Sequence, residues 1–235
     1  MPLNKSLVTG IGKLKNGLYA LFLKSSCPLC DRPTEVELCE YCQRQLLRCQ
    51  LKHPTKFWQG QLPVFVWGNY DSVLKRAIAA LKYDNQPQLA RLLGHCLGRA
   101  WIKSPTATGA EKLTVVPIPL HLTKLQQRGY NQAELIARSF CEIAGYKQQP
   151  LGLERIRATE AQFGLSVQER EQNLTDAFVI GKNFNRQLTT SPVLLVDDIY
   201  TSGATVRAAA DTLRRQGIRV YGVVAIATSR KETQI

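Results

Sequence analysis

One continuous stretch of the chain, residues 193–205, reads Val-Leu-Leu-Val-Asp-Asp-Ile-Tyr-Thr-Ser-Gly-Ala-Thr and strongly constrains the fold. Its leading apolar residues are typical of a strand that is buried on both faces, as in a parallel sheet. Two acids and a short loop with hydroxyls and a glycine follow. Residues 204–216 then have helical periodicity, ended by Gly217. Such a strand–loop–helix unit is typical of open α/β sheets, which bind ligands at the carboxyl ends of their strands.

The same alternation of strands and helices runs over residues 62–235. A chain of 235 residues is long enough for one buried core and a small appendage, and 44% hydrophobic residues are typical of a globular protein. We predict one α/β domain, residues 61–235, with a doubly wound, mostly parallel sheet. The polar segment 147–175 is predicted to be a long loop or a short helix. The predicted strands are 62–67, 113–119, 193–196 and 220–227, and the predicted helices are 72–81, 89–102, 131–144 and 204–216.

Two shorter segments precede this domain. Residues 1–24 are predicted to form a basic amphipathic helix that covers a neighbouring domain or lies on a membrane surface. No apolar run is long enough to cross a bilayer, so we expect no transmembrane segment. The apolar stretch 17–23 is interrupted by Lys24 and is followed by no small-residue cleavage site, so we expect a cytoplasmic protein without a secretion signal.

The second segment, residues 25–60, carries a cluster of cysteines. Four of the seven cysteines form two Cys-x-x-Cys pairs, and they are Cys27, Cys30, Cys39 and Cys42. Each pair places two thiolates on one side of a turn, and two such turns supply the tetrahedral sulfur ligands that Zn²⁺ prefers. We therefore predict a closed, structural Zn²⁺ site in a small module that folds with its metal. Cys49 or His53 as a substitute ligand, and a redox role for the paired cysteines, are the alternatives.

The loop after the predicted strand 193–196 offers groups that bind phosphate. Its hydroxyls and backbone N–H groups, and the positive end of the following helix dipole, favour an anion. Asp197 and Asp198 supply the hard oxygen atoms that bind Mg²⁺ or sugar hydroxyls. A strand end with a simple helix cap is the alternative interpretation. The predicted phosphate loop consists of Thr201, Ser202, Gly203, Ala204 and Thr205.

At these positions the chain resembles the type I phosphoribosyltransferases. Their motif for phosphoribosyl pyrophosphate (PRPP) is four apolar residues, two acids, two further residues and a Thr/Ser-Gly-x-Thr loop. Residues 115–121 resemble the strand and loop that hold pyrophosphate in that superfamily. The resemblance implies a phosphoribosyltransferase-like fold and PRPP contacts at Pro119, Leu120 and His121. For His121, a purely local hydrogen bond is the alternative role.

Further motifs resemble the ComF family, which is named for bacterial DNA uptake. These motifs are the four-cysteine segment, Leu81-Lys-Tyr83, residues 128–137 and Glu169-Arg170. The resemblance covers nearly the whole chain. One departure is Lys124, where family members commonly carry an arginine, because a lysine cannot bind phosphate with the bidentate geometry of a guanidinium.

The resemblance also places a flexible catalytic loop in the polar segment 153–175. Within it, Arg157 and Arg170 are predicted to contact pyrophosphate and, with Asp197 and Asp198, to be the catalytic residues; solvated side chains are the alternative for the arginines. Arg128 is predicted to bind PRPP with them, or to pair with Glu134. The sequence identifies no general base and no acceptor pocket.

Two functions are consistent with these features. In the first, the protein binds PRPP with Mg²⁺ and transfers or senses ribose 5-phosphate in the context of DNA uptake. In the second, it is a non-catalytic competence accessory protein that senses nucleotides or handles single-stranded DNA. The net charge of +13, from 31 Lys and Arg against 18 Asp and Glu, favours anionic partners in both cases. A third interpretation has the zinc module docking a helicase-like competence protein. For base stacking near that module the sequence offers Tyr41, Phe57 and Trp58.

Overall fold

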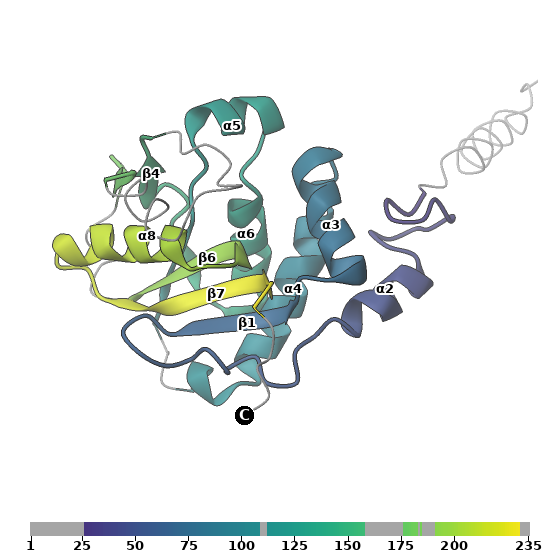
Figure 1. Ribbon diagram of the computed structural model, residues 1–235, viewed down its shortest axis with the longest axis horizontal. Coiled ribbons are helices and arrows are strands. Elements are labelled where there is room, and N and C mark those ends of the chain that lie inside the picture. Colours follow the sequence, from purple (N-terminus) through teal and green to yellow (C-terminus); the bar gives the residue numbers. More distant parts are fainter. Residues whose placement is uncertain (1–25, 109–111, 158–175, 183, 185–190, 231–235) are drawn as a thin grey trace, which may run out of the picture.

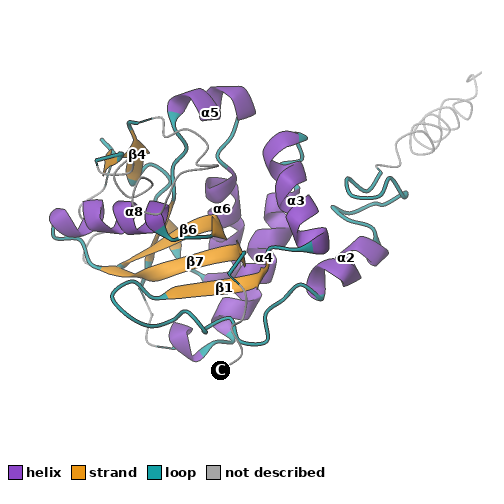
Figure 2. Ribbon diagram, in the orientation of Figure 1, coloured by secondary structure: helices purple, strands orange, loops and turns teal. Residues whose placement is uncertain are grey.

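The computed structural model describes residues 26–108, 112–157, 176–182, 184 and 191–230. Within these residues a five-stranded sheet in the order β1-β7-β6-β2-β3, parallel at every pairing, lies between helices (Figures 1 and 2). The predicted α/β class and phosphoribosyltransferase-like sheet are confirmed. The strands of this sheet are β1 (Val64–Asn69), β2 (Thr114–Pro117), β3 (Lys147–Gln148), β6 (Val193–Tyr200) and β7 (Val220–Thr228), and β4 (Leu153–Arg155) and β5 (Phe178–Ile180) form a separate antiparallel pair. The helices are α2 (Glu40–Leu47), α3 (Ser72–Tyr83), α4 (Leu89–Ile102), α5 (Leu122–Arg128), α6 (Gln132–Ala144) and α8 (Ala204–Arg215), with a 3₁₀ turn at Pro105–Ala107.

The sheet has an apolar core on each face. Along β6, Leu194 and Val196 pack with α3, α4 and α6, whereas Val193 and Leu195 pack with α8. All four side chains are fully buried. Successive side chains of a strand point to opposite faces, so a strand covered on both faces must be apolar throughout. This is why β6 is such a clear apolar run in the sequence.

The structure differs from the sequence prediction in two places. The segment predicted as a loop or short helix contains β3 and β4, which are too short and too polar to show a period of two. Strand β6 runs four residues beyond its prediction, because Asp197, Ile199 and Tyr200 continue to pair with β7. The predicted helix 1–24 and residues 158–175 lie outside the described part of the chain.

The cysteine segment packs against the same core as the sheet. Cys27, Cys42 and Leu46 are buried in one apolar cluster with residues of α3 and α4, and α2 lies beside α3 (Figure 1). Arg76 of α3 donates a hydrogen bond to the carbonyl of Leu29, between the first two cysteines (3.2 Å). The contact between these parts is therefore apolar as well as polar. Their division into separate domains remains a prediction.

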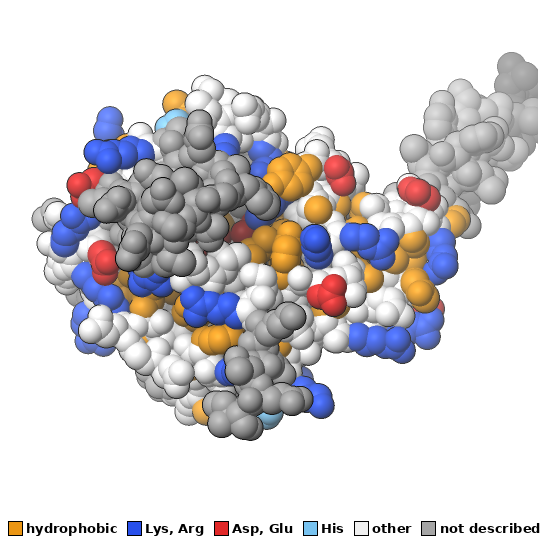
Figure 3. All heavy atoms as spheres, viewed as in Figure 1, with side chains coloured by type: hydrophobic (Ala, Val, Ile, Leu, Met, Phe, Trp, Pro, Cys, Tyr) orange, Lys and Arg blue, Asp and Glu red, His pale blue; other side chains and the backbone are white. Residues whose placement is uncertain are grey.

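The surface agrees with the basic composition. Lys and Arg side chains are spread over the face that Figure 3 presents and do not gather in one patch there. Among the described helices, none is both long enough and apolar enough to cross a bilayer.

Candidate functional site

The neighbouring strands β2 and β6 separate at their carboxyl ends. The last residue of β2, Pro117, is paired with Val196, and the amide of Ile118 makes a further bond to the carbonyl of Val196 (2.9 Å). Beyond this point the chain leaves the sheet towards α5, while β6 continues beside β7. The connection after β6 leads to β7 on one side and the connection after β2 leads to β3 on the other. This is a topological switch point, the place where open α/β sheets bind ligands.

The two acids of β6 lie at this opening. Asp198 is 5% exposed and forms an ion pair with Lys82 from the last turn of α3, with 2.6 Å between Nζ and Oδ2. Asp197 accepts a hydrogen bond from the backbone N–H of Asp198 at Oδ1 (2.8 Å). Burial is the largest single effect on the pKa of Lys82 and lowers it, but the charge of Asp198, its hydrogen bond to Lys82 and the charge of Asp197 together raise the pKa above its usual value. Lys82 is therefore a permanent cation beside the acidic pair.

A cavity of about 270 Å³ surrounds the acids. It combines carboxylates, two threonine hydroxyls, two cations and the turn that follows β2, so charges of both signs face one small volume. The acids and the threonines of the predicted phosphate loop are therefore brought together, with residues from α3, the turn after β2, α6 and β4. The lining residues are Lys82, Ile118, Pro119, Leu120, Gln132, Arg155, Asp197, Asp198, Ile199, Thr201 and Thr205.

Asp197 is the carboxyl group whose protonation is most affected by this setting. Burial raises its pKa to about 7, and the charge of Asp198 acts in the same direction, while Lys82 and Arg155 oppose the shift. The folded protein therefore retains a proton between about pH 4 and pH 7 that the unfolded chain releases. Ionisation of Asp197 thus makes the fold less stable as the pH rises through this window.

This titration predicts that an Asp197→Asn variant gains unfolding free energy, relative to the wild type, as the pH rises. Near pH 5 the variant and the wild type should unfold with similar free energies, whereas near pH 8 the variant should be more stable by on the order of 2 kcal/mol. Urea unfolding at both pH values measures the difference. Asp211→Asn, which changes an exposed carboxylate on α8, is the control. A constant difference between Asp197→Asn and wild type across this range would contradict the assignment.

The loop between β6 and α8 is held in one shape by two arginines. Arg230 donates from Nε to the carbonyl of Thr201 (2.6 Å) and from Nη2 to the carbonyl of Ser202 (2.7 Å), and Arg207 donates to the same Ser202 oxygen (2.9 Å). Gly203 caps α8 with a φ of 81°, and a Cβ there would lie 2.8 Å from Cε2 of Tyr200. Glycine is required for both reasons.

Four cations gather around the cavity. The side chain of Lys124, on α5, is exposed, and its pKa is lowered first by partial burial of the ammonium group and then by the neighbouring charges of Arg155, Arg128 and Lys82. Burial also lowers the pKa of Arg155, while the charge of Asp197 raises it. This excess of positive charge beside one acidic pair favours a ligand with several negative charges.

The motif at residues 128–131 fixes the wall of the cavity. Gly129 ends α5 in the left-handed conformation with a φ of 81°, and Tyr130 donates from its hydroxyl to the carbonyl of Leu81, next to Lys82 (2.5 Å). Asn131 accepts from the N–H of Ala133 at the start of α6 (3.1 Å) and donates to the carbonyl of Ile118 (3.0 Å). The motif thus holds the turn after β2 and the end of α3 together.

The other predicted site residues are divided between several places. Pro119 and Leu120 line the cavity, while His121 begins α5 and accepts the backbone N–H of Thr123 at Nδ1 (3.4 Å). Arg128 contacts Gln132 and lies 5.7 Å from the ring of Tyr83. Ser202, Gly203 and Ala204 shape the phosphate loop without lining the cavity. Arg157 is exposed and away from the cavity lining, and Arg170 lies outside the described residues.

Sequence reasoning missed Lys82 and Arg230. A signal for Lys82 exists, because it follows the buried Ile78 by four residues and therefore falls on the apolar stripe of α3. A lysine in such a position needs a carboxylate partner. Nothing in the sequence around Arg230 indicates that it returns to the loop after β6.

The cysteine segment forms a second candidate site. The sulfur atoms of Cys27, Cys30, Cys39 and Cys42 lie within 4.8 Å of one another, and those of Cys30 and Cys39 are 3.4 Å apart. A tetrahedral Zn²⁺ with bonds near 2.3 Å places its sulfur ligands about 3.8 Å apart. Cys39 precedes α2. A hydrogen bond from the backbone N–H of Cys42 is the main cause that lowers the pKa of Cys39 to about 7. The four cysteines are positioned to bind a metal ion, and a sulfur-only donor set suits zinc.

The remaining cysteines lie outside this cluster. Cys49 contacts the carbonyl of Gln45 with its thiol (3.6 Å) and is not part of the four-sulfur group. Cys96 and Cys141 pack against the core, and burial raises their pKa values to about 11 and about 12. These two thiols are packing residues.

Comparison with known proteins identifies relatives that are named for competence and DNA utilization. No family model matches the chain. It is 32% identical over 161 residues to Competence protein F of Haemophilus influenzae, covering 66% of this chain and 69% of that protein. It is 27% identical over 201 residues to DNA utilization protein YhgH of Escherichia coli (81% and 85% covered), and 24% identical over 192 residues to Competence protein ComFC of Bacillus subtilis (81% and 72% covered).

The parallel sheet and the four-cysteine cluster together define an α/β protein with a phosphoribosyltransferase-like fold and an N-terminal segment whose cysteines are positioned to bind a metal ion. The similarity to Competence protein F covers more than two thirds of that protein. The chain belongs to the ComF family.

Proposed function

We propose that the cavity between β2 and β6 binds PRPP with Mg²⁺, and that the protein transfers or senses ribose 5-phosphate in the context of DNA uptake. The observation that carries this proposal is the joint presence of Asp197, Asp198, Thr201 and Thr205 in one cavity at the switch point. The context of DNA uptake rests on relatives that are named for competence and DNA utilization. The four cysteines hold a structural Zn²⁺ in this proposal.

Each group in the cavity has a role in the proposed reaction. The loop of Thr201 and Thr205 binds the 5-phosphate, and the acidic pair binds the ribose hydroxyls. Mg²⁺, when bound, supplies positive charge to the pyrophosphate. Arg155 and Lys82 add charge at the same end of the cavity, where negative charge develops as pyrophosphate leaves.

The bond changes are those of a substitution at C1 of the ribose. The bond from C1 to the pyrophosphate oxygen breaks and its electron pair leaves with pyrophosphate. The acceptor nucleophile forms the new bond to C1 and releases its proton to solvent. No step needs a redox partner, and catalysis comes from positioning and charge stabilisation.

Calorimetric titration of PRPP in the presence and absence of Mg²⁺ tests the proposal. Saturable, Mg²⁺-dependent binding is expected, and Thr205→Val should weaken it by at least about tenfold, because one hydroxyl is lost at nearly constant volume. Asp197→Asn/Asp198→Asn should abolish it, and Asp211→Asn on the exposed face of α8 is the matched control. Absence of saturable binding by a folded wild-type protein would refute the proposal.

A second function, handling of single-stranded DNA without catalysis, is favoured by the net charge of +13 and by the names of the relatives. The aromatic residues near the cysteines give it limited support. Trp58 packs against Trp101, and Phe57 against Tyr200, so of the three candidates only Tyr41 is exposed (46%), with Arg32 over its ring. Salt-dependent binding of single-stranded DNA that Tyr41→Ala weakens, with unchanged PRPP binding, would support this function. DNA affinity unaffected by Tyr41→Ala would place the DNA elsewhere.

A further inference from the structure

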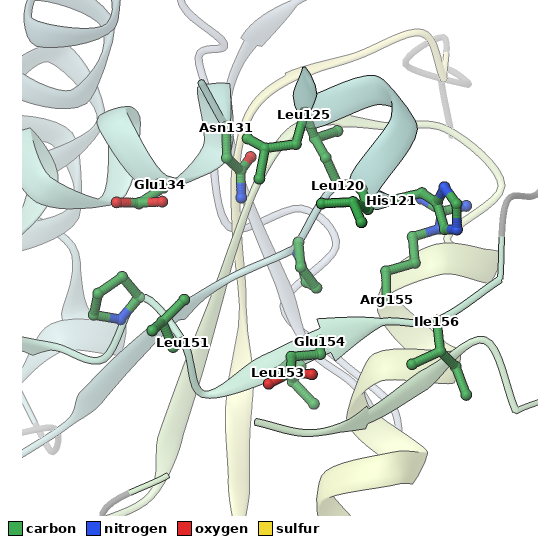
Figure 4. A pocket seen from close by; sticks show the side chains of 13 residues that line it. Leu120, His121, Leu125, Asn131, Glu134, Leu151, Leu153, Glu154, Arg155 and Ile156 are labelled. Carbon is green, nitrogen blue, oxygen red and sulfur yellow. The ribbon is translucent and has the colours of Figure 1, made fainter. Parts of the chain in front are cut away.

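A second, larger cavity, drawn in Figure 4, shares part of its wall with the first. Its volume is about 450 Å³, within the range of small-molecule sites. It shares Pro119, Leu120 and Arg155 with the cavity at the acidic pair, but it contains neither the acids nor the phosphate loop. Its walls come from the turn after β2, from α5, from the first turn of α6 and from residues 150–156.

The walls of this cavity are apolar and open to water. Leu122, Leu125, Leu151 and Ile156 line it and are 60%, 37%, 54% and 54% exposed. They are four of the nine most exposed large apolar side chains in the described part of the chain. Single exposed leucines are ordinary on a protein surface, but four around one hollow are typical of a binding site.

The polar groups of the cavity favour a cation. Glu134 of α6 and Glu154 of β4 bring two carboxylates to the lining, against one guanidinium, that of Arg155. In Figure 4, Glu134 stands on one side of the opening, and His121 and Arg155 stand on the opposite side. The charge of Arg155 interacts with Asp197 of the first cavity, so the carboxylates determine the charge that the second cavity offers to a ligand.

The two carboxylates, of Glu134 and Glu154, make only weak interactions within the protein. Oε1 of Glu134 lies 3.7 Å from Arg138, one helical turn further along α6; the side chain of Arg138 is exposed and that of Glu134 is half-buried. Salt bridges at a protein surface contribute roughly 0–1 kcal/mol to the free energy of folding. Oε1 of Glu154 accepts the backbone N–H of Lys182 (3.2 Å). The amide of Asn131, in contrast, is already bonded through both its nitrogen, to the carbonyl of Ile118, and its oxygen, to the N–H of Ala133. A ligand cation therefore competes only with weak interactions at Glu134.

We propose that this second cavity binds a small organic cation, an amine carried on an apolar or aromatic body. The body packs on the leucines and the ammonium group lies beside Glu134. A concave site of this volume takes a small molecule in preference to a protein segment. This proposal does not depend on PRPP binding, because the second cavity contains none of the acids or phosphate-loop residues.

The test uses the full chain and two probes of similar size and opposite charge, 2-phenylethylamine and phenylacetate. Amide chemical shifts are recorded while each probe is added up to about 20 mM. Saturable shifts are expected for the amine at residues 120–125 and 150–156, with a dissociation constant in the millimolar range, which is typical of so small a ligand. The carboxylate probe should bind at least about tenfold more weakly.

Two pairs of variants complete the test. Leu151→Ser should weaken binding of the amine several-fold. Ile102→Ser, which changes a similarly exposed apolar side chain on α4 (50%), should leave the affinity unchanged. Glu134→Gln should remove most of the preference for the amine, whereas Glu40→Gln on α2 should not. No saturable shift at these residues, or equal affinity for both probes, would overturn the proposal. So would a dimer in solution that Leu151→Ser converts to monomer, because the leucines would then be covered by a second copy.

Discussion

A Lys82→Met variant is expected to lose about 3–5 kcal/mol of unfolding free energy at neutral pH, which is a large fraction of the stability of a single domain. Methionine keeps the length and the packing of the side chain but removes its charge. The carboxylate of Asp198, 6% exposed as a side chain, would then be buried without its ion-pair partner. The loss comes from that uncompensated charge more than from the attraction between the two groups.

Two further variants separate this effect from simple packing damage. Lys82→Met/Asp198→Leu removes both charges and should recover most of the lost stability, since a buried ion pair can be replaced by apolar groups with little net change. Lys75→Met on the exposed face of α3 should change the unfolding free energy by less than about 0.5 kcal/mol. Urea unfolding measures all of them. If the double variant is no more stable than Lys82→Met, the ion pair is not the cause.

The second large effect is expected at the cysteine cluster. The purified protein should contain one metal ion per chain, and Cys39→Ser should lose it and lower the midpoint of thermal unfolding by about 10 °C or more. The reason is that Leu46 and Cys42 are buried against α3 and α4, so the loss of the metal exposes part of the shared apolar core. Elemental analysis and calorimetry measure the two results.

The other cysteines provide matched controls for this experiment. Cys96→Ser and Cys141→Ser change half-buried thiols outside the cluster and should keep the full metal content. A strong chelator should reproduce the effect of Cys39→Ser in the wild type and should have no further effect on that variant. Retention of a full metal complement by Cys39→Ser would show that these four sulfurs are not the ligands.

The parts of the fold and site that the sequence predicts are those that depend on neighbouring residues. The first four residues of β6, 193–196, are fully buried, so their apolar run is unambiguous, and the acids and loop that follow them lie within the next nine residues. The four sulfur ligands likewise lie within sixteen residues. In both cases one short stretch of backbone supplies most of the geometry, and residue spacing is then sufficient.

The parts that the sequence does not predict depend on contacts between distant residues. Lys82 reaches Asp198 across more than one hundred residues, and Arg230 returns to the loop after β6 only because β7 lies beside β6. Arg128 belongs to a motif that the resemblance connects with ligand binding, yet its neighbours Tyr130 and Asn131 hold the backbone in place. Residue type alone does not show whether a side chain binds a ligand itself or supports the backbone of a turn that binds the ligand.

Helix α3 gives the cysteine segment a practical importance for any study of this protein. Arg76 binds the carbonyl of Leu29 in the first cysteine turn, and Lys82, six residues and about 9 Å further along the helix, binds Asp198. A shortened protein that starts at residue 61 would therefore lose the surface on which this helix rests. Ligand affinities are therefore best measured on a chain that includes the cysteine segment, because this segment packs on the helix that carries Lys82.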